Sequence, residues 1–342
     1  MRQVSPYRSA DRLAMDTIEN IMSAYPLGKV EYAARYTNGV SNSCFFVTTN
    51  SGNYVLKVYN KSRTKEEILF EVSLLHQLGK QSFPCPQPQM TMTKEFLWQY
   101  EGGYCSVFSY LPGRSLKQSE IIESVVAQVG VLYACFRKAV DGLTPIGQKL
   151  NADQEVPKII SNVQFSHDGP SKLELLGSAL EESCQHIGNH IGSQEVVHGD
   201  FFYENVIFDN GNIVGVVDFD DAYLGSPLLD FALAAMEFSV QEGSEAFASS
   251  MLNAFVRSYL TILPELPGTS LEIVEGIRYQ CCKFAVYLNE LASTHIRHQD
   301  YHIYNPYMIR LDHLQCADIR SHLVMEIDRS LESARGTYDP GK

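Results

Sequence analysis

The sequence lacks an excess of basic residues, and this absence excludes one large class of partners. Of its 342 residues, 27 are Lys or Arg and 40 are Asp or Glu, so the formal net charge is −13. A general nucleic-acid binder carries a positive balance, and we therefore expect no nucleic-acid partner. A local phosphate site needs only a few donors and remains compatible with this composition.

Long apolar runs and metal-type cysteine spacings are also missing. No run of 18 apolar residues occurs, which argues against a membrane-spanning helix, and residues 1–16 lack the apolar stretch of a secretory signal. The eight cysteines are scattered without a CxxC spacing or a zinc-type Cys/His cluster, which is typical of reduced thiols. We expect a cytoplasmic protein with no membrane partner.

Three common catalytic motifs are absent as well. The nearest approach to a phosphate-binding Walker A loop runs from Gly142 to Gln148 and lacks the required Lys and Ser/Thr. The sequence contains neither a GxSxG elbow nor an HExxH zinc motif. These absences argue against a P-loop nucleoside triphosphatase, an α/β-hydrolase and a zinc protease.

The segments that are present predict two domains of different character. Residues 1–110 have a net charge of +2 and residues 111–342 a net charge of −15. The first part combines β-forming segments at 32–36, 43–49 and 53–59 with a helix at 64–79 that has a capping box and ends at Gly79. Helical periodicity dominates the second part, at 118–139, 171–191, 227–260, 270–296 and 311–333. The pattern predicts an α+β protein with a sheet-rich domain at 1–110 and a helical domain at 111–342.

The polar chemistry gathers around one predicted hairpin. Apolar strands at 206–208 and 213–217 flank an Asn-Gly turn, with Asp200 and Asn205 before the first strand and Asp218 after the second. Because a hairpin brings its two ends together, we expect these three side chains to converge. Two carboxylates and an amide oxygen suit Mg²⁺ held with substrate phosphates. Asp, then Asn five residues later, then a further Asp is also the order used in phosphoryl transfer.

The first domain contains residues that could complete such a site. Lys57 lies mid-strand, and strand alternation places it on the face opposite Leu56 and Val58. Glu71 lies among apolar residues of the 64–79 helix, where a buried carboxylate needs a partner, and Lys57 is the obvious one. The polar segment 38–43 lies between two strands, where a loop could cover phosphates.

This set of residues resembles the aminoglycoside phosphotransferase superfamily, also called the choline-kinase superfamily. The resemblance rests on His198-Gly199-Asp200-x₄-Asn205 and on 217–222 followed by 229–232. It implies a bilobal protein-kinase-like fold, ATP and Mg²⁺ as cofactors, and Asp200 as the catalytic base. It further implies that Asn205 and Asp218 bind the metal ion. Phosphate binding is implied for Lys57 with its partner Glu71 and for Gly39, Ser41 and Asn42. The backbone from Ser109 to Leu111 would bind adenine.

Two departures from the family pattern blur the subfamily. Many relatives carry a His three residues after the catalytic Asp, where this chain has Tyr203. The segment expected to cover the phosphates has one glycine, Gly39, rather than three. Neither departure touches the residues on which the reaction class depends.

The small-molecule acceptor is less well defined by the sequence. Segments 39–49, 54–57, 83–86 and 111–116 are similar to type II homoserine kinases, which favours an amino alcohol or hydroxy amino acid that resembles homoserine. A homoserine kinase would need an Arg for the substrate carboxylate, and Arg278 and Arg297 are the candidates. Further candidates for the acceptor pocket are Tyr203, Asp220, Tyr223 and Glu290.

Other acceptors and roles stay open at this point. The acidic second part favours a polycationic acceptor such as an aminoglycoside. Choline, methylthioribose and other sugars are further options. A protein Ser/Thr kinase of the same superfamily and a non-catalytic pseudokinase are the two alternatives of another class. The presence of Lys57, Asp200, Asn205 and Asp218 together argues against the pseudokinase.

Overall fold

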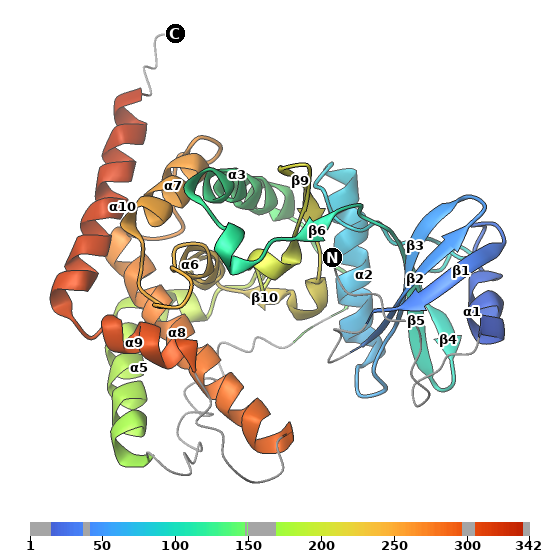
Figure 1. Ribbon diagram of the computed structural model, residues 1–342, viewed down its shortest axis with the longest axis horizontal. Helices are drawn as coiled ribbons and strands as arrows, with labels where there is room; N and C mark the ends of the chain where they lie inside the picture. Colours follow the sequence, from blue (N-terminus) through green and yellow to red (C-terminus); the bar gives the residue numbers. More distant parts are fainter. Residues whose placement is uncertain (1–14, 37–41, 148, 150–168, 296–304, 338–342) are drawn as a thin grey trace. The chain divides into compact units, whose positions relative to one another are not determined.

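A computed structural model describes residues 15–36, 42–147, 149, 169–295 and 305–337 of the chain (Figure 1). The chain divides into two compact units. The first consists of Met1–Leu116, Gly142–Lys149 and Glu204–Asp220. The second consists of Lys117–Asp141, Leu150–Tyr203 and Asp221–Lys342. These units differ from the predicted division at residue 110, because two later segments return to the first unit.

The first unit is built on a five-stranded antiparallel sheet in the order β1-β2-β3-β5-β4. Its strands are β1 Val30–Arg35, β2 Ser43–Thr49, β3 Gly52–Val58, β4 Trp98–Tyr100 and β5 Gly103–Ser109. Side chains alternate across the sheet, so Leu56 packs in the apolar core formed with α1 (Met15–Met22), whereas Lys57 points to the other face. The expected hairpin between β2 and β3 is confirmed by the pairing of Thr49 with Gly52.

Helix α2 (Lys65–Lys80) covers the face that carries Lys57 (Figure 1). Its predicted capping box is confirmed: the Glu67 N–H donates to the Thr64 hydroxyl, and the Thr64 N–H donates to the Glu67 carboxylate. The helix does not end at Gly79 as predicted. It continues to Lys80, and the left-handed residue that follows is Ser82, with φ of +59°.

A smaller antiparallel sheet in the first unit contains the predicted hairpin of the second half of the sequence. Its order is β6-β8-β9, with bounds β6 Arg114–Ser115, β8 Val206–Asp209 and β9 Asn212–Val216. A hydrogen bond of 2.9 Å from the Val216 N–H to the Pro84 carbonyl joins β9 to the connector that follows α2. The hairpin therefore packs with the first 116 residues, although it lies about 100 residues later in the chain.

The second unit is mainly helical. Its elements are the 3₁₀ turn η1 Gln118–Glu120, helices α3 Glu123–Val140, α5 Gly169–Ile191, α6 Pro227–Glu237, α7 Ser249–Leu260, α8 Ser270–His295, α9 Pro306–His313 and α10 Ala317–Thr337, and the paired strands β7 Glu195–Val197 and β10 Tyr223–Gly225. The helical pattern predicted over 227–260 is found as two helices with a break between them. The chain turns between α6 and α7, where Gly243 and Glu245 adopt positive φ and Val240 pairs with Phe247. The single helix predicted at 311–333 is likewise two helices, α9 and α10.

Tyr133 of α3 lies at the centre of the aromatic core of the second unit. Its ring lies 4.9 Å from that of Phe201, 5.8 Å from Phe231 and 6.0 Å from Phe255, measured between centroids. All four side chains are buried. Each aromatic side chain of this size buries 150–250 Å², so this cluster supplies a large share of the hydrophobic stabilisation of the unit. It also anchors the segment around Phe201, which directly follows Asp200.

Candidate active site

Lys57 and Glu71 form the buried ion pair that strand alternation predicts. The Lys57 Nζ donates to Glu71 Oε1 at 2.7 Å, and both side chains are nearly inaccessible to solvent. Lys57 comes from β3 and Glu71 from α2, so the pair joins the sheet to the helix that covers it. The other carboxylate oxygen of Glu71, Oε2, is buried without a hydrogen-bond partner among the described residues.

Asp220 is a second carboxylate on the same lysine. Its Oδ1 accepts a hydrogen bond from Lys57, and its Oδ2 accepts one of 2.6 Å from the side-chain amide of Asn42. Asn42, a predicted phosphate-loop residue, also accepts a hydrogen bond from the Asn60 N–H at 2.9 Å. The sequence analysis placed Asp220 in the acceptor pocket. Its contacts in the first unit instead associate it with the predicted phosphate lysine.

Two further cations, which the sequence analysis did not single out, lie at Asp220. The guanidinium of Arg63 is 3.9 Å from the Asp220 carboxylate, and Lys149 donates to the Asp220 main-chain carbonyl. Neither residue belongs to a motif in the sequence. Arg63 stands directly before the Thr64 cap of α2, which is the only sequence signal that could have placed it near this cluster.

The cluster sets the protonation of its members through burial and mutual charge. Burial raises the pKa of Glu71 to about 8, with the neighbouring Asp220 carboxylate as the second cause and Lys57 opposing it. Burial also acts to raise the pKa of Asp220, but the Lys57 ammonium wins and holds it well below its ordinary value. The pKa of Lys57 is raised because Asp220 and Glu71 together outweigh its desolvation. Of the two carboxylates, Asp220 is therefore the one that holds its negative charge more strongly beside Lys57.

Asn205 and Asp218 lie at the open end of the β8–β9 hairpin. Val206 pairs with Val216, and the Val217 N–H donates to the Asn205 carbonyl at 2.9 Å, so the two ends of the hairpin run side by side. Asp218 is exposed between two buried neighbours and has a left-handed backbone with φ of +68°. A non-glycine residue in that region is unusual, and such conformations cluster at ligand-binding positions.

The predicted adenine-binding backbone lies at the end of β5. The Ser109 N–H already donates to the Gln87 carbonyl at 2.9 Å, and the Tyr110 N–H donates to the Asn53 carbonyl at 3.3 Å. Gly215 of β9 lies close beneath this segment: a Cβ added there would lie 2.6 Å from the Pro84 carbonyl oxygen and 2.9 Å from a Leu111 methyl. Of the three predicted positions, Leu111 is therefore the best suited to offer its N–H to a ligand.

Asp200 belongs to the second unit, where Asp230 holds the preceding backbone. The Gly199 N–H donates to Asp230 Oδ1 at 2.8 Å, and the Tyr133 hydroxyl donates to Oδ2 at 2.9 Å. Gly199 has φ of +78°, and a Cβ there would lie only 2.3 Å from the Asp221 carbonyl oxygen. Asp230 was part of the 229–232 motif but received no role from the sequence. Its burial at the start of α6 is the feature that marks it as a positioning residue.

The predicted acceptor residues of the second unit have different surroundings. Arg278 of α8 is buried, and its guanidinium donates to Glu275 at 2.8 Å and to Glu182 at 2.9 Å. These contacts favour a structural role in place of the predicted binding of a substrate carboxylate. Tyr223 is buried in β10, and the Tyr203 ring packs edge-on against Phe202 with centroids 5.7 Å apart.

Four predicted site residues lie outside the described part of the chain, one of them by its side chain only. Gly39, Ser41 and Arg297 lie outside the described residues, as does the side chain of Glu290, whose backbone belongs to α8. Their predicted roles remain predictions.

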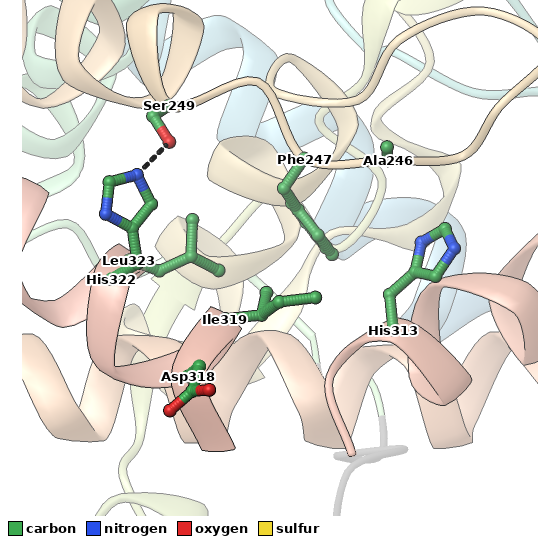
Figure 2. A pocket seen from close by; sticks show the side chains of 8 residues that line it. All are labelled: Ala246, Phe247, Ser249, His313, Asp318, Ile319, His322 and Leu323. Carbon is green, nitrogen blue, oxygen red and sulfur yellow. Dashed lines mark hydrogen bonds between the residues drawn. The ribbon is translucent and has the colours of Figure 1, made fainter. Parts of the chain in front are cut away.

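One open pocket of about 400 Å³ lies elsewhere in the second unit (Figure 2). Figure 2 shows Phe247, Ile319 and Leu323 as its apolar lining, with His322 hydrogen-bonded to Ser249 at 2.8 Å. The remaining lining residues are Ala246, His313 and Asp318. None of the residues that line it was predicted as a site residue.

Comparison with known proteins identifies the family. The model of the phosphotransferase enzyme family (APH) matches residues 33–269, which include Lys57, Asp200, Asn205 and Asp218. The chain belongs to this family. It is a small-molecule kinase, a phosphotransferase with an alcohol group as acceptor, as the sequence resemblance predicted.

Curated relatives of this phosphotransferase include homoserine kinases. The enzyme of Methylobacillus flagellatus is 24% identical over 257 residues, which is 74% of this chain and 77% of the relative. That of Methylocella silvestris is 26% identical over 265 residues, covering 77% and 81%. This level of sequence identity supports membership of the same family but does not identify the acceptor that this chain phosphorylates.

Solved structures share the fold. An amicoumacin kinase in complex with AMP-PNP and Ca²⁺ has a TM-score of 0.65 at 14% identity and covers 93% of both chains. A microcompartment-associated aminopropanol kinase has a TM-score of 0.64 at 14% identity, covering 94% of this chain and 97% of its own. These matches confirm the predicted α+β protein-kinase-like fold. Within the described part of the chain, no helix is long and apolar enough to cross a membrane.

Proposed function

We propose that the protein is an ATP- and Mg²⁺-dependent kinase that phosphorylates the hydroxyl of a small amino alcohol or hydroxy amino acid resembling homoserine. The observation that carries the nucleotide part of this proposal is the buried Lys57 cluster in the first unit. An ammonium has three N–H donors. Glu71 and Asp220 take two of them, and the third is suited to a nucleotide phosphate.

The residues at the open end of the β8–β9 hairpin fit a magnesium ion. Mg²⁺ in kinases uses one or two protein oxygens together with substrate phosphates and water. The exposed Asp218 carboxylate and the Asn205 amide offer two such oxygens from adjacent backbone positions. In this role the ion would neutralise phosphate charge, and the related amicoumacin kinase was solved with AMP-PNP and Ca²⁺.

Asp200 is the proposed base for the acceptor hydroxyl. Its carboxylate would accept the hydroxyl proton as the acceptor oxygen forms its bond to the γ-phosphorus and the bond to the ADP oxygen breaks. The hydrogen bond from Gly199 to Asp230 and the left-handed conformation of Gly199 fix the backbone directly before it. Asp230 therefore acts through Asp200 as a positioning residue.

The remaining nucleotide contacts follow from the first unit. The Leu111 N–H is the proposed donor to adenine, because those of Ser109 and Tyr110 are already used within the protein. Asn42, held by Asp220 and Asn60, is the described part of the segment proposed to cover the phosphates.

The acceptor class is supported by the relatives rather than by a bound ligand. The curated relatives are homoserine kinases, and one structural neighbour is an aminopropanol kinase, so both act on small hydroxyl compounds that carry an amine. The acidic composition of 111–342 favours an aminoglycoside as the second candidate, and a spectinomycin phosphotransferase with a TM-score of 0.59 shares the fold.

The test is ATP consumption by the purified protein with Mg²⁺ and a panel of acceptors. The panel contains homoserine, 3-aminopropan-1-ol, choline, methylthioribose and aminoglycosides. We expect turnover with homoserine or a close analogue. Turnover with an aminoglycoside alone would replace the first acceptor by the second. Nucleotide binding without turnover on any acceptor would contradict the proposed class.

Substitution Asp200→Asn separates chemistry from binding. The variant keeps the shape of the side chain but is a far weaker base, so transfer should fall by about 10²–10⁴-fold. Nucleotide binding, followed as thermal stabilisation by ATP and Mg²⁺, should be retained. The matched control is Asp209→Asn, at the exposed end of β8 in the same hairpin, which should keep wild-type turnover.

A further inference from the structure

Helix α8 presents a lysine and a tyrosine one turn apart toward the segment that carries Asp200. Residues four apart lie on one face of a helix, so Lys283 and Tyr287 are neighbours. The Lys283 Nζ lies 5.7 Å from the centroid of the Tyr223 ring and 5.8 Å from that of Phe284. These cation–π distances place the ammonium beside β10.

The Tyr223 ring connects this lysine to the backbone of the catalytic segment. Tyr223 pairs with Val197 of β7, and β7 leads directly to Gly199 and Asp200. A Cβ added to Gly199 would lie 3.0 Å from a carbon of the Tyr223 ring, so the ring touches the residue before the proposed base. Lys283, Tyr223 and Gly199 thus form a continuous series of contacts within the second unit.

Tyr287 extends the same face toward the carboxylates. Its side chain is 54% exposed, so it can be reached by a ligand. Burial of part of the ring raises its pKa, and the Asp221 and Asp200 carboxylates add to the effect in that order. Both carboxylates therefore lie within electrostatic range of the phenol. Among the described residues, this corner of the second unit combines the carboxylates of Asp200 and Asp221 and the phenol of Tyr287 with the ammonium of Lys283.

Such a combination of charges selects for an acceptor that carries both signs. The carboxylate of Asp221 and the phenol of Tyr287 would attract an ammonium group. Lys283 would disfavour a second cationic group beside it, such as an aminoglycoside carries, but it would form a charge-assisted hydrogen bond with a carboxylate. Arg278, five residues earlier on α8, donates to Glu275 and Glu182.

We infer that Lys283 determines specificity by binding the carboxylate of a zwitterionic hydroxy amino acid, with Tyr287 and Asp221 receiving its ammonium group. This inference rests on the proposed function, because it takes Asp200 as the base that receives the acceptor hydroxyl. It narrows that function from amino alcohols in general to acceptors that carry a carboxylate.

The experiment compares two acceptors that differ by one group. Homoserine and 3-aminopropan-1-ol share the hydroxyl, the chain and the amine, and only homoserine carries the carboxylate. In Lys283→Met, kcat/KM for homoserine should fall by about 30-fold, mainly through KM, because a hydrogen bond to a charged group is lost. The kcat/KM value for 3-aminopropan-1-ol should change by less than about threefold, because this acceptor has no carboxylate and the substitution should leave the rest of the site intact.

Three further measurements fix the interpretation. Lys283→Arg keeps the charge and should recover most of the homoserine activity. Lys138→Met, which removes an exposed lysine on α3, should leave both acceptors unchanged. Thermal unfolding of each variant shows whether it is folded, and the ratio of the two acceptors is insensitive to the folded fraction.

The possible outcomes separate the inference from the function on which it rests. Equal loss for both acceptors in Lys283→Met, or no loss for either, overturns the role of Lys283 while the kinase activity stands. A wild-type preference for 3-aminopropan-1-ol over homoserine also overturns it. Absence of turnover with either acceptor, despite nucleotide binding, overturns the proposed acceptor class itself.

Discussion

Two buried clusters, one in each unit, have the same charge composition but different surroundings. In the first unit Lys57 is engaged by Glu71 and Asp220, and in the second unit Arg310 donates to Glu237 at 2.8 Å and to Glu245 at 2.7 Å. Each cluster sets two carboxylates around one cation. A buried ion pair alone therefore does not identify a functional site.

The difference lies in the cation and in what remains unsatisfied. Arg310 uses separate nitrogens of its planar guanidinium for the two carboxylates, and its guanidinium also stacks 4.7 Å from the Tyr307 ring. Lys57 is a compact ammonium with a third donor, and Glu71 Oε2 is buried without a partner among the described residues. The Arg310 cluster holds α6, the turn before α7 and α9 together. The Lys57 cluster is the one at which we propose that the nucleotide phosphates bind.

The largest expected effect is on stability, from Arg310→Met. Removal of the guanidinium leaves Glu237 and Glu245 buried without their cation, which typically costs about 3–5 kcal/mol. We expect this loss in the free energy of unfolding measured by urea denaturation, with little change in kcat of the folded protein. Arg329→Met is the control. The Arg329 side chain is 63% exposed in its ion pair with Glu326, so its removal should cost at most about 1 kcal/mol. Equal losses in the two variants would remove the structural distinction.

The next effect is on catalysis, from Lys57→Met. Loss of a preorganised cation at the transferring phosphoryl group should lower kcat/KM by about 10²–10³-fold. Turnover of ATP with the preferred acceptor measures it, and Lys65→Met, an exposed lysine in the first turn of α2, is the matched control. If Lys57→Met retained near wild-type turnover, the two clusters would be equivalent and the nucleotide role of Lys57 would be wrong.

The smallest effect sharpens the comparison within the first cluster. Glu71→Gln keeps the shape of the side chain and leaves Lys57 with Asp220 as a neutral pair, so the free energy of unfolding should change by no more than about 1 kcal/mol. The lysine loses one of the two groups that orient it, and kcat/KM should fall by about tenfold. Urea denaturation and the same turnover assay check both values. A stability loss above 3 kcal/mol would show that Glu71 acts mainly as a structural counter-ion.

Local patterns in the sequence predicted the parts of the site that depend on one element or on adjacent elements. The alternation of β3 and the apolar surroundings of Glu71 were sufficient to pair Lys57 with Glu71, only 14 positions later. The Asn-Gly turn was sufficient to predict the hairpin that aligns Asn205 with Asp218. The break between α6 and α7 was missed, because apolar periodicity continues across it and the left-handed turn depends on two residues, Gly243 and Glu245.

By itself, the sequence determined the secondary structure around the site, the family and the reaction class, because strand alternation, capping and motif spacing are local properties of the chain. Only the tertiary structure decided which charges far apart in the sequence meet. Asp220 reaches Lys57 across 163 positions, and Arg278 is engaged by Glu275 and by Glu182, 96 positions earlier. The energy of a buried charge depends on every neighbour within a few ångströms, and those neighbours come from elements that no local pattern relates.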